Sequence, residues 1–301
     1  MSTTADSTRS TFDGSQAVLQ AKQDDNAIEA EVAFLKYEPT YELEKLYTIN
    51  YNTDGILPRT NAENELKTIS VQNFRKIQTP PSFDVCGFAT QKLCSSLEMA
   101  DFDDSTKVKE VFYAEVKGVL KEMYPAACAI EVLEHQIRKR TPQFPYHTGE
   151  PYANLLPTNL VHIDFTTDSA IKSGRAAFKE RATQYSKLLV VNLWKSLQGL
   201  GNDWPLALCD ARTVDYENDL ESQDLVFADR YNENSRVYYN DKQKWYYYAN
   251  LRDDEIVVFQ QMDSQAPFGR GVPHTGFFNP FADKDAAPRV SIEIRVFIYF
   301  K

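Results

Sequence analysis

Cysteine and histidine are both scarce in this chain of 301 residues, with four of each. The cysteines lie far apart and form neither a CxxC pair nor a spacing typical of zinc sites: Cys86, Cys94, Cys128 and Cys209. A disulfide framework and a zinc finger therefore have no support. We expect all four cysteines to be reduced residues of the core.

An excess of positive charge and long hydrophobic runs are also missing. The chain has 33 Lys and Arg against 43 Asp and Glu, a net charge of −10, whereas a nucleic-acid or anionic-membrane surface needs a basic face. No segment approaches the roughly eighteen apolar residues of a membrane span, and the N-terminus lacks the basic and hydrophobic segments of a signal peptide. We expect a cytoplasmic protein that binds neither nucleic acid nor membrane.

The residues that are present describe one globular domain. Hydrophobic residues make up 43% of the chain and aromatic residues 13%, which is ample material for a core. Residues 1–25 are rich in Ser, Thr, Asp and Gln and too poor in apolar residues to order themselves, so we expect a flexible N-terminal tail. No repeat or linker divides residues 26–301, for which we expect a single domain.

The distribution of periodic segments predicts a mainly β fold with flanking helices. Apolar residues recur at helical spacing between Asp104 and Pro125, and again over residues 168–187. The later half is dominated by short β-branched or aromatic runs, such as KLLVVNLW, PLALCDARTV, EIVVFQQMD and RVSIEIRVFIYF. Early helices followed by many strands favour a jelly roll, the cupin-like double-stranded β-helix.

The segment LVHIDFT, residues 160–166, places two metal-binding side chains on one strand. Because successive side chains alternate between the faces of a strand, His162 and Asp164 point to the same side. An imidazole and a carboxylate from one strand need one further histidine to form the facial triad that holds Fe(II) and leaves coordination positions open. The sequence therefore predicts a two-histidine, one-carboxylate iron site.

Three other histidines can complete this triad. His135 lies beside two arginines and is typical of a hydrogen-bonded structural histidine, and His147 lies between a proline and a glycine in a loop. His274 stands far along the chain, close to the final strand. Strands that are distant in sequence lie side by side in a jelly roll, so we predict that the third ligand is His274.

The final strand carries a pair that suits a carboxylate ligand. In PRVSIEIRVFIYF, Arg289 and Ser291 share one strand face. A guanidinium binds a carboxylate through two parallel hydrogen bonds, and the hydroxyl adds a neutral donor. This pair suits the distal carboxylate of 2-oxoglutarate. Each fragment is weak alone, and the order His-x-Asp, His, Arg-x-Ser carries the prediction.

With these residues in place, the sequence resembles the fungal and bacterial iron and 2-oxoglutarate oxygenases of the gibberellin desaturase and cephalosporin 7α-hydroxylase type. The resemblance spans residues 132–300 and is carried by EHQIRKR, VHIDFTTDSA, NLWKSL, PLALCDARTV, KWYYYANLRDDEIVVFQQMDS, PHTGFFNP and PRVSIEIRVFIYF. It implies a double-stranded β-helix that binds Fe(II) through His162, Asp164 and His274 and anchors 2-oxoglutarate at Arg289. The reaction would use O₂, with ascorbate helpful in vitro.

The resemblance further implies the kind of reaction. Members hydroxylate, desaturate or cyclise small molecules of secondary metabolism at a C–H bond, and the C-terminal strand is similar to that of fungal aziridine-forming oxygenases, which suggests an amino-acid-derived substrate. Two departures stand out, because Lys195 occupies a position where an arginine is typical and a basic residue near Gln260 is missing. We therefore expect substrate contacts that differ from those of relatives.

Several alternatives remain open from sequence. Arg295 shares a strand face with Arg289 and needs an anionic partner, either an internal carboxylate such as Glu293 or the carboxylate of a substrate. Asn192, Lys195 and Tyr185 could contact the co-substrate or serve the fold. The rival functions are an iron-dependent oxidase without 2-oxoglutarate and a catalytically inactive jelly-roll binding protein. The oligomeric state is not encoded in any pattern found here.

Overall fold

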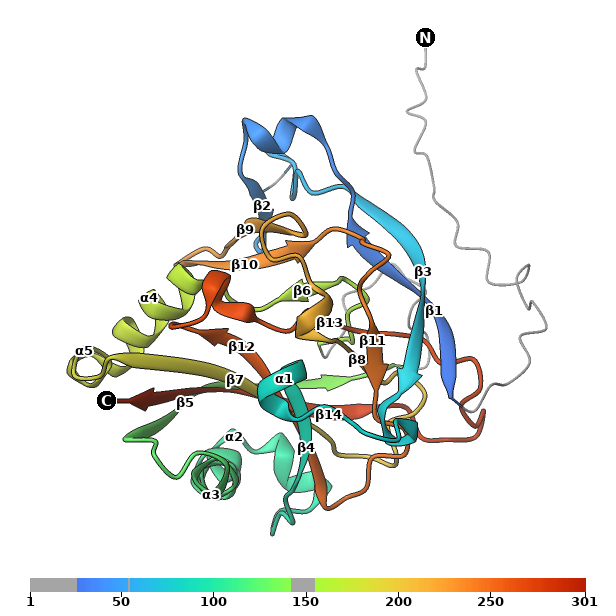
Figure 1. The fold of residues 1–301 in the computed structure, drawn as a ribbon, viewed down its shortest axis with the longest axis vertical. Helices are drawn as coiled ribbons and strands as arrows, with labels where there is room; N and C mark the ends of the chain where they lie inside the picture. The colour runs from blue at the N-terminus through green and yellow to red at the C-terminus, as the bar shows by residue number, and fades with distance from the viewer. Residues whose placement is uncertain (1–25, 54, 142–154) are drawn as a thin grey trace.

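The computed structural model describes residues 26–53, 55–141 and 155–301, which form two packed β-sheets flanked by helices (Figure 1). The expected N-terminal tail and His147 lie outside the described residues. The larger sheet has the strand order β1-β3-β11-β8-β13-β6-β10-β9-β2, and the smaller sheet has the order β4-β12-β7-β14-β5. Most neighbouring strands are antiparallel, as a jelly roll requires.

The nine strands of the larger sheet are β1 (Ala27–Leu35), β2 (Leu46–Ile49), β3 (Asn64–Asn73), β6 (His162–Ile163), β8 (Leu206–Cys209), β9 (Leu220–Val226), β10 (Tyr231–Val237), β11 (Trp245–Tyr247) and β13 (His274–Gly276). The smaller sheet contains β4 (Phe88–Lys92), β5 (Ala129–Lys139), β7 (Lys187–Ser196), β12 (Glu255–Asp263) and β14 (Val290–Phe300). The predicted mainly β architecture is therefore present.

The helices are short and lie outside or at one end of the sheets: α1 (Phe83–Cys86), α2 (Ser105–Lys107), α3 (Tyr113–Met123), α4 (Thr167–Phe178) and α5 (Glu180–Thr183). A π-helical turn at Val108–Phe112 joins α2 to α3, so the predicted helix is continuous. Asp104 caps it by accepting hydrogen bonds from the amides of Thr106 and Lys107. Helices in the described residues are all too short or too polar to span a bilayer.

Strand alternation on β14 separates the hydrophobic core from the site. One face of the strand packs against the π-turn and α3, burying Ile292, Ile294, Val296, Phe112 and Val116 in one cluster. The opposite face carries Arg289 and Ser291 at the start of the strand and looks toward the larger sheet. The polar residues of the site are thus displayed inside the roll, on a strand whose other face is fully apolar.

The cysteines are only partly where the sequence analysis placed them. All four are free thiols, and Cys86 and Cys209 are buried as expected. The expectation is wrong for Cys94 and Cys128, which are exposed. These two lie just outside the ends of β4 and β5, where the chain leaves the sheet and faces solvent.

Candidate metal centre

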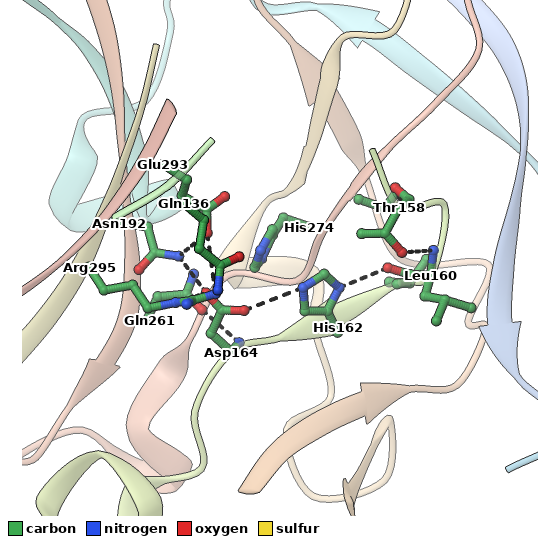
Figure 2. Close-up of polar contacts among 12 residues, drawn as sticks. Gln136, Thr158, Leu160, His162, Asp164, Asn192, Gln261, His274, Glu293 and Arg295 are labelled. Carbon is green, nitrogen blue, oxygen red and sulfur yellow. Dashed lines mark hydrogen bonds and ion pairs between the residues drawn. The ribbon is translucent and has the colours of Figure 1, made fainter. Parts of the chain in front are cut away.

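The three predicted metal ligands converge at one point between the sheets (Figure 2). His162 lies on β6, Asp164 follows in the next turn, and His274 lies on β13, directly opposite His162 in the antiparallel register. One ligand atom from each residue lies within 4.8 Å of the others. The His162 and His274 ring centroids are 4.4 Å apart, and His162 Nε2 is 3.4 Å from Asp164 Oδ1. In the described part of the chain this is the single group with metal-binding geometry.

Both imidazoles are oriented by the backbone. His162 Nδ1 lies 2.8 Å from the carbonyl oxygen of Leu160, and His274 Nδ1 lies 3.2 Å from that of Val272. A carbonyl oxygen only accepts, so each Nδ1 carries the proton and each Nε2 keeps its lone pair for a metal. Burial, with a smaller effect from the His162 ring, lowers the pKa of His274 to about 3. His274 is therefore neutral at physiological pH, which is the form that binds metals.

Asp164 is held so that one oxygen remains available. Its Oδ2 accepts hydrogen bonds from Asn192 Nδ2 at 2.7 Å and from Arg295 Nε at 2.8 Å. Burial acts to raise the pKa of Asp164, but the charge of Arg295 and the neighbouring hydrogen bonds outweigh it and hold the pKa well below its usual range. Two neutral imidazoles and one carboxylate are the donor set of the Fe(II) facial triad, so the residues present fit ferrous iron.

A small pocket opens beside the metal ligands. Its wall is formed by both sheets and is lined by Arg138, Thr158, His162, Leu206, His274, Thr275, Gly276, Arg289 and Glu293. Two guanidinium groups and two imidazoles thus face one confined space. The two guanidinium groups carry positive charge and donate hydrogen bonds, so they favour a small anion over a neutral ligand.

Arg289 lines this pocket, and Ser291 is hydrogen-bonded to it. Arg289 Nε donates to Ser291 Oγ at 3.0 Å, its Nη1 donates to the carbonyl of Trp204 at 2.8 Å, and its guanidinium stacks over the Trp194 ring at 4.8 Å. Burial and the nearby Arg138 lower the pKa of Arg289 to about 9, which leaves it charged at neutral pH. Arg289 is only 3% exposed, and these three partners are all neutral. Such a charge calls for an anionic ligand.

The fold brings to the site two further residues that were not predicted from the sequence. Arg138 lies on β5 opposite Ser291 of β14, so it faces the same pocket as Arg289. Gln261 is the extra residue of a β-bulge in β12, where the register skips from Gln260 to Met262, and its Oε1 accepts a hydrogen bond from the Asp164 amide at 2.8 Å. No sequence motif marks either residue. The orientation of Arg138 depends on the pairing of β5 with β14, and that of Gln261 depends on the bulge in β12.

Three further candidates serve the fold or the metal ligands. Asn192 contacts Asp164. Lys195 donates from its buried ammonium to the backbone carbonyls of Asp253 and Glu255. Tyr185 packs against Tyr299 with ring centroids 5.7 Å apart. For Lys195 and Tyr185, these contacts favour a role in the fold over contact with the co-substrate.

The two remaining arginine and histidine candidates also have internal partners. His135 Nδ1 shares a 2.8 Å hydrogen bond with the Tyr113 hydroxyl, as expected of a structural histidine. Arg295 contacts three carboxylates: Asp164, Glu134 and Glu293. From the sequence, the anionic partner of Arg295 could be an internal carboxylate or the carboxylate of a substrate. These contacts favour an internal carboxylate. A substrate contact of Arg295 stays a prediction without support from them.

Comparison with known proteins finds similarity to fungal oxygenases. A family model described as "Oxidoreductase/YMDC permease-like domain" matches residues 33–299. The Fe(II)/2-oxoglutarate-dependent dioxygenase nvfI of Aspergillus novofumigatus is 26% identical over 206 residues, covering 67% of this chain and 71% of the relative. The alpha-ketoglutarate-dependent dioxygenase phiK of a fungal species (strain ATCC 74256) is 26% identical over 268 residues, covering 83% and 92%.

The fold is shared with a solved structure. An iron and alpha-ketoglutarate-dependent endoperoxidase, NvfI, superposes with a TM-score of 0.79 at 23% identity and covers 91% of this chain and 98% of that protein. This confirms the predicted jelly-roll class, and the names of the relatives confirm the predicted resemblance to fungal iron and 2-oxoglutarate oxygenases. Because the family model spans most of its length, the chain belongs to the Oxidoreductase/YMDC permease-like domain family.

Proposed function

We propose that this protein is an Fe(II)- and 2-oxoglutarate-dependent dioxygenase that acts on a C–H bond of a small molecule in secondary metabolism. One observation carries the proposal. His162, Asp164 and His274 present two Nε2 atoms and one carboxylate oxygen to a common point, next to a confined pocket that contains the buried charge of Arg289. This is a metal centre with an anion site beside it.

The residues of the chain have separate tasks in this proposal. His162, Asp164 and His274 hold the ferrous ion and leave the remaining coordination positions free. When bound, iron and 2-oxoglutarate supply the oxidising power that breaks a C–H bond with O₂, and succinate and carbon dioxide are the co-products. Arg289 and Ser291 bind the distal carboxylate of the co-substrate, and Arg138 adds positive charge to the same pocket.

Glu293 is the one acidic residue among those lining the pocket. Burial and the negative charge of Asp164 raise its pKa. A carboxyl group that protonates more readily opposes an entering dianion less. The pocket therefore remains electrostatically suited to 2-oxoglutarate although it contains a glutamate.

The small-molecule substrate is less defined than the co-substrate. We propose an amino-acid-derived metabolite as the first class to screen, on the similarity of the C-terminal strand to aziridine-forming oxygenases. Relatives named as a hydroxylase/desaturase, efuI of Hormonema carpetanum, and as an endoperoxidase, NvfI, extend the reactions to be monitored. Hydroxylation, desaturation and ring closure differ in substrate position and not in metal ligands.

An anaerobic optical titration tests the proposed function. Adding Fe(II) and 2-oxoglutarate to the protein without oxygen is expected to produce a weak charge-transfer band near 500 nm, roughly the range of this cofactor chemistry. His274→Gln is expected to lose the band because one ligand is gone. Metal binding without the band would favour the oxidase that needs no 2-oxoglutarate. Failure to bind metal would favour the inactive jelly-roll binding protein.

A further inference from the structure

Asp164 directly follows strand β6 of the larger sheet, but three of its hydrogen-bond partners come from the smaller sheet. The residue follows β6, whereas Asn192 lies on β7, Arg295 on β14 and Gln261 on β12. These three strands are adjacent in the order β12-β7-β14, and Asn192 and Arg295 are opposite each other in register. One face of the smaller sheet thus holds a residue of the opposing sheet (Figure 2).

The contacts differ between the two carboxylate oxygens. Asn192 Nδ2 and Arg295 Nε both donate to Oδ2, at 2.7 Å and 2.8 Å. Oδ1 instead faces His162 Nε2 at 3.4 Å. Gln261 fixes the backbone by accepting from the Asp164 amide at 2.8 Å. With Oδ2 occupied by two donors, Oδ1 is the oxygen that faces the other ligands.

The clamp itself is held by further carboxylates. Arg295 Nη1 donates to Glu134 Oε1 at 2.6 Å, and its Nη2 lies 3.6 Å from Glu293 Oε1. Asn192 Nδ2 also lies within hydrogen-bond distance of Glu293 Oε1, at 3.2 Å. Arg295 therefore has an acidic partner along each side of its fork, so its orientation toward Asp164 is determined by more than one ion pair.

We infer that Arg295 and Asn192 form a carboxylate clamp that makes Asp164 a metal ligand through Oδ1 alone. A carboxylate that binds through one oxygen occupies one coordination position, and a carboxylate that binds through two occupies an additional one. The clamp therefore preserves the positions that the co-substrate and O₂ require. Both are positioning residues, since they act through Asp164. The inference rests on the proposed function, because it assumes that the site binds a divalent metal.

Cobalt(II) binding without turnover separates this role from a purely structural ion pair. Asn192→Ala removes one donor to Oδ2 and leaves every charge in place, and Arg295→Gln removes the other donor. Loss of such outer contacts is expected to weaken Co(II) binding by about 10- to 100-fold. The visible spectrum of the Co(II)-saturated variants is expected to change, because the carboxylate no longer binds in one fixed geometry. A residue that only joins the sheets would lower the melting temperature without altering that spectrum.

Lys195→Gln is the matched control, since Lys195 is a buried cation on the same strand as Asn192 but bonds to backbone carbonyls away from the metal ligands. It is expected to bind Co(II) within about twofold of the unmodified protein and to keep its spectrum. Wild-type affinity and an unchanged spectrum in Asn192→Ala would overturn the clamp and leave the proposed function standing. If Arg295→Gln does not fold, the result for Asn192→Ala alone tests the clamp. An unmodified protein that binds no divalent metal would overturn both.

Discussion

At the scale of single residues, the site depends on charges that the fold has removed from water. Arg289 is buried against a hydroxyl, a backbone carbonyl and an indole ring, none of which neutralises it. Burying an unpaired charge is costly, and a protein retains such a group when a ligand or a neighbour compensates it. The anion that enters the pocket is therefore expected to gain much of its affinity from this one side chain.

Replacing Arg289 tests that expectation. Arg289→Gln is expected to weaken 2-oxoglutarate binding by about 2 kcal/mol, roughly thirtyfold, because a charged hydrogen-bond donor is lost. Ser291→Ala removes a neutral donor and is expected to cost about 1 kcal/mol, roughly fivefold. Calorimetric titration of 2-oxoglutarate into the manganese-loaded protein measures both. Equal affinity in both variants and the unmodified protein would show that the distal carboxylate binds elsewhere.

His274 makes the stability of the metal-free protein dependent on pH. Its pKa is lowered to about 3 in the folded state, against about 6.5 for an unfolded histidine. The unfolded chain therefore binds more protons between these values, and stability falls as pH decreases through that interval. From pH 7 to pH 5 the loss is expected to be about 2 kcal/mol.

Urea unfolding of the metal-free protein at pH 7 and pH 5 measures this loss, with His274→Gln as the control that lacks the titrating ring. The lowered pKa of Asp164 acts only below about pH 4, where an unfolded aspartate titrates, so it does not contribute in this interval. The same pH dependence in His274→Gln would contradict the assignment to this histidine.

At the scale of elements, close packing decides what each helix tolerates. Helix α4 approaches the end of β14, and a Cβ atom added at Gly174 would lie 2.8 Å from the Tyr299 hydroxyl and 3.3 Å from the Phe297 ring. Both aromatic residues are buried and belong to the cluster that α4 covers. Gly118 in α3 has open space at the corresponding point.

The two glycines form a matched pair of substitutions. Gly118→Ala is expected to stabilise the protein by about 1 kcal/mol, because alanine is the better helix former. Gly174→Ala gains the same propensity but forces buried aromatic rings to shift, and is expected to destabilise the protein by about 1–2 kcal/mol overall. Urea unfolding at neutral pH measures both free energies. A stabilised Gly174→Ala would mean that α4 does not pack tightly on β14.

At the scale of the whole molecule, the metal centre exists only in the folded state. Its ligands come from β6, the turn after it, and β13, which meet because the larger sheet pairs distant segments. The two amide side chains and the arginine that orient Asp164 come from the opposing sheet. A metal that binds this arrangement is therefore expected to stabilise the entire fold.

Cobalt(II) at about 100 times its dissociation constant is expected to raise the free energy of unfolding by about 2.7 kcal/mol. Addition of a chelator is expected to reverse the gain. His162→Gln removes one ligand, and its unfolding is expected to respond little to the same cobalt concentration. Urea titrations with and without metal measure the increment. An equal increment in this variant would place the bound metal outside the predicted centre.

Several properties of the whole chain remain predictions from composition. These are the cytoplasmic location, the single domain over residues 26–301, the flexible tail over residues 1–25 and the absence of nucleic-acid partners. Each follows from charge and hydrophobicity summed over many residues. Such sums describe solubility and order, and they say little about how the segments are arranged.

The sequence by itself determined those parts of the site that follow from local geometry. Alternation along a strand was enough to place His162 beside Asp164 and Arg289 beside Ser291, and helical periodicity located the helix that begins after Asp104. The choice of His274 needed the added expectation of a jelly roll. The local placements agree with the structure because the period of a strand or a helix is a property of neighbouring residues, whereas the role of His274 as a ligand stays a prediction.

Only the tertiary structure decided which of these local patterns meet. It placed Arg138 opposite Ser291, turned Gln261 toward Asp164 through a bulge, and directed Arg295 to internal carboxylates. It also exposed Cys94 and Cys128 at the ends of their strands. The register between strands far apart in the chain depends on the packing of both sheets at once, and no local period contains that information.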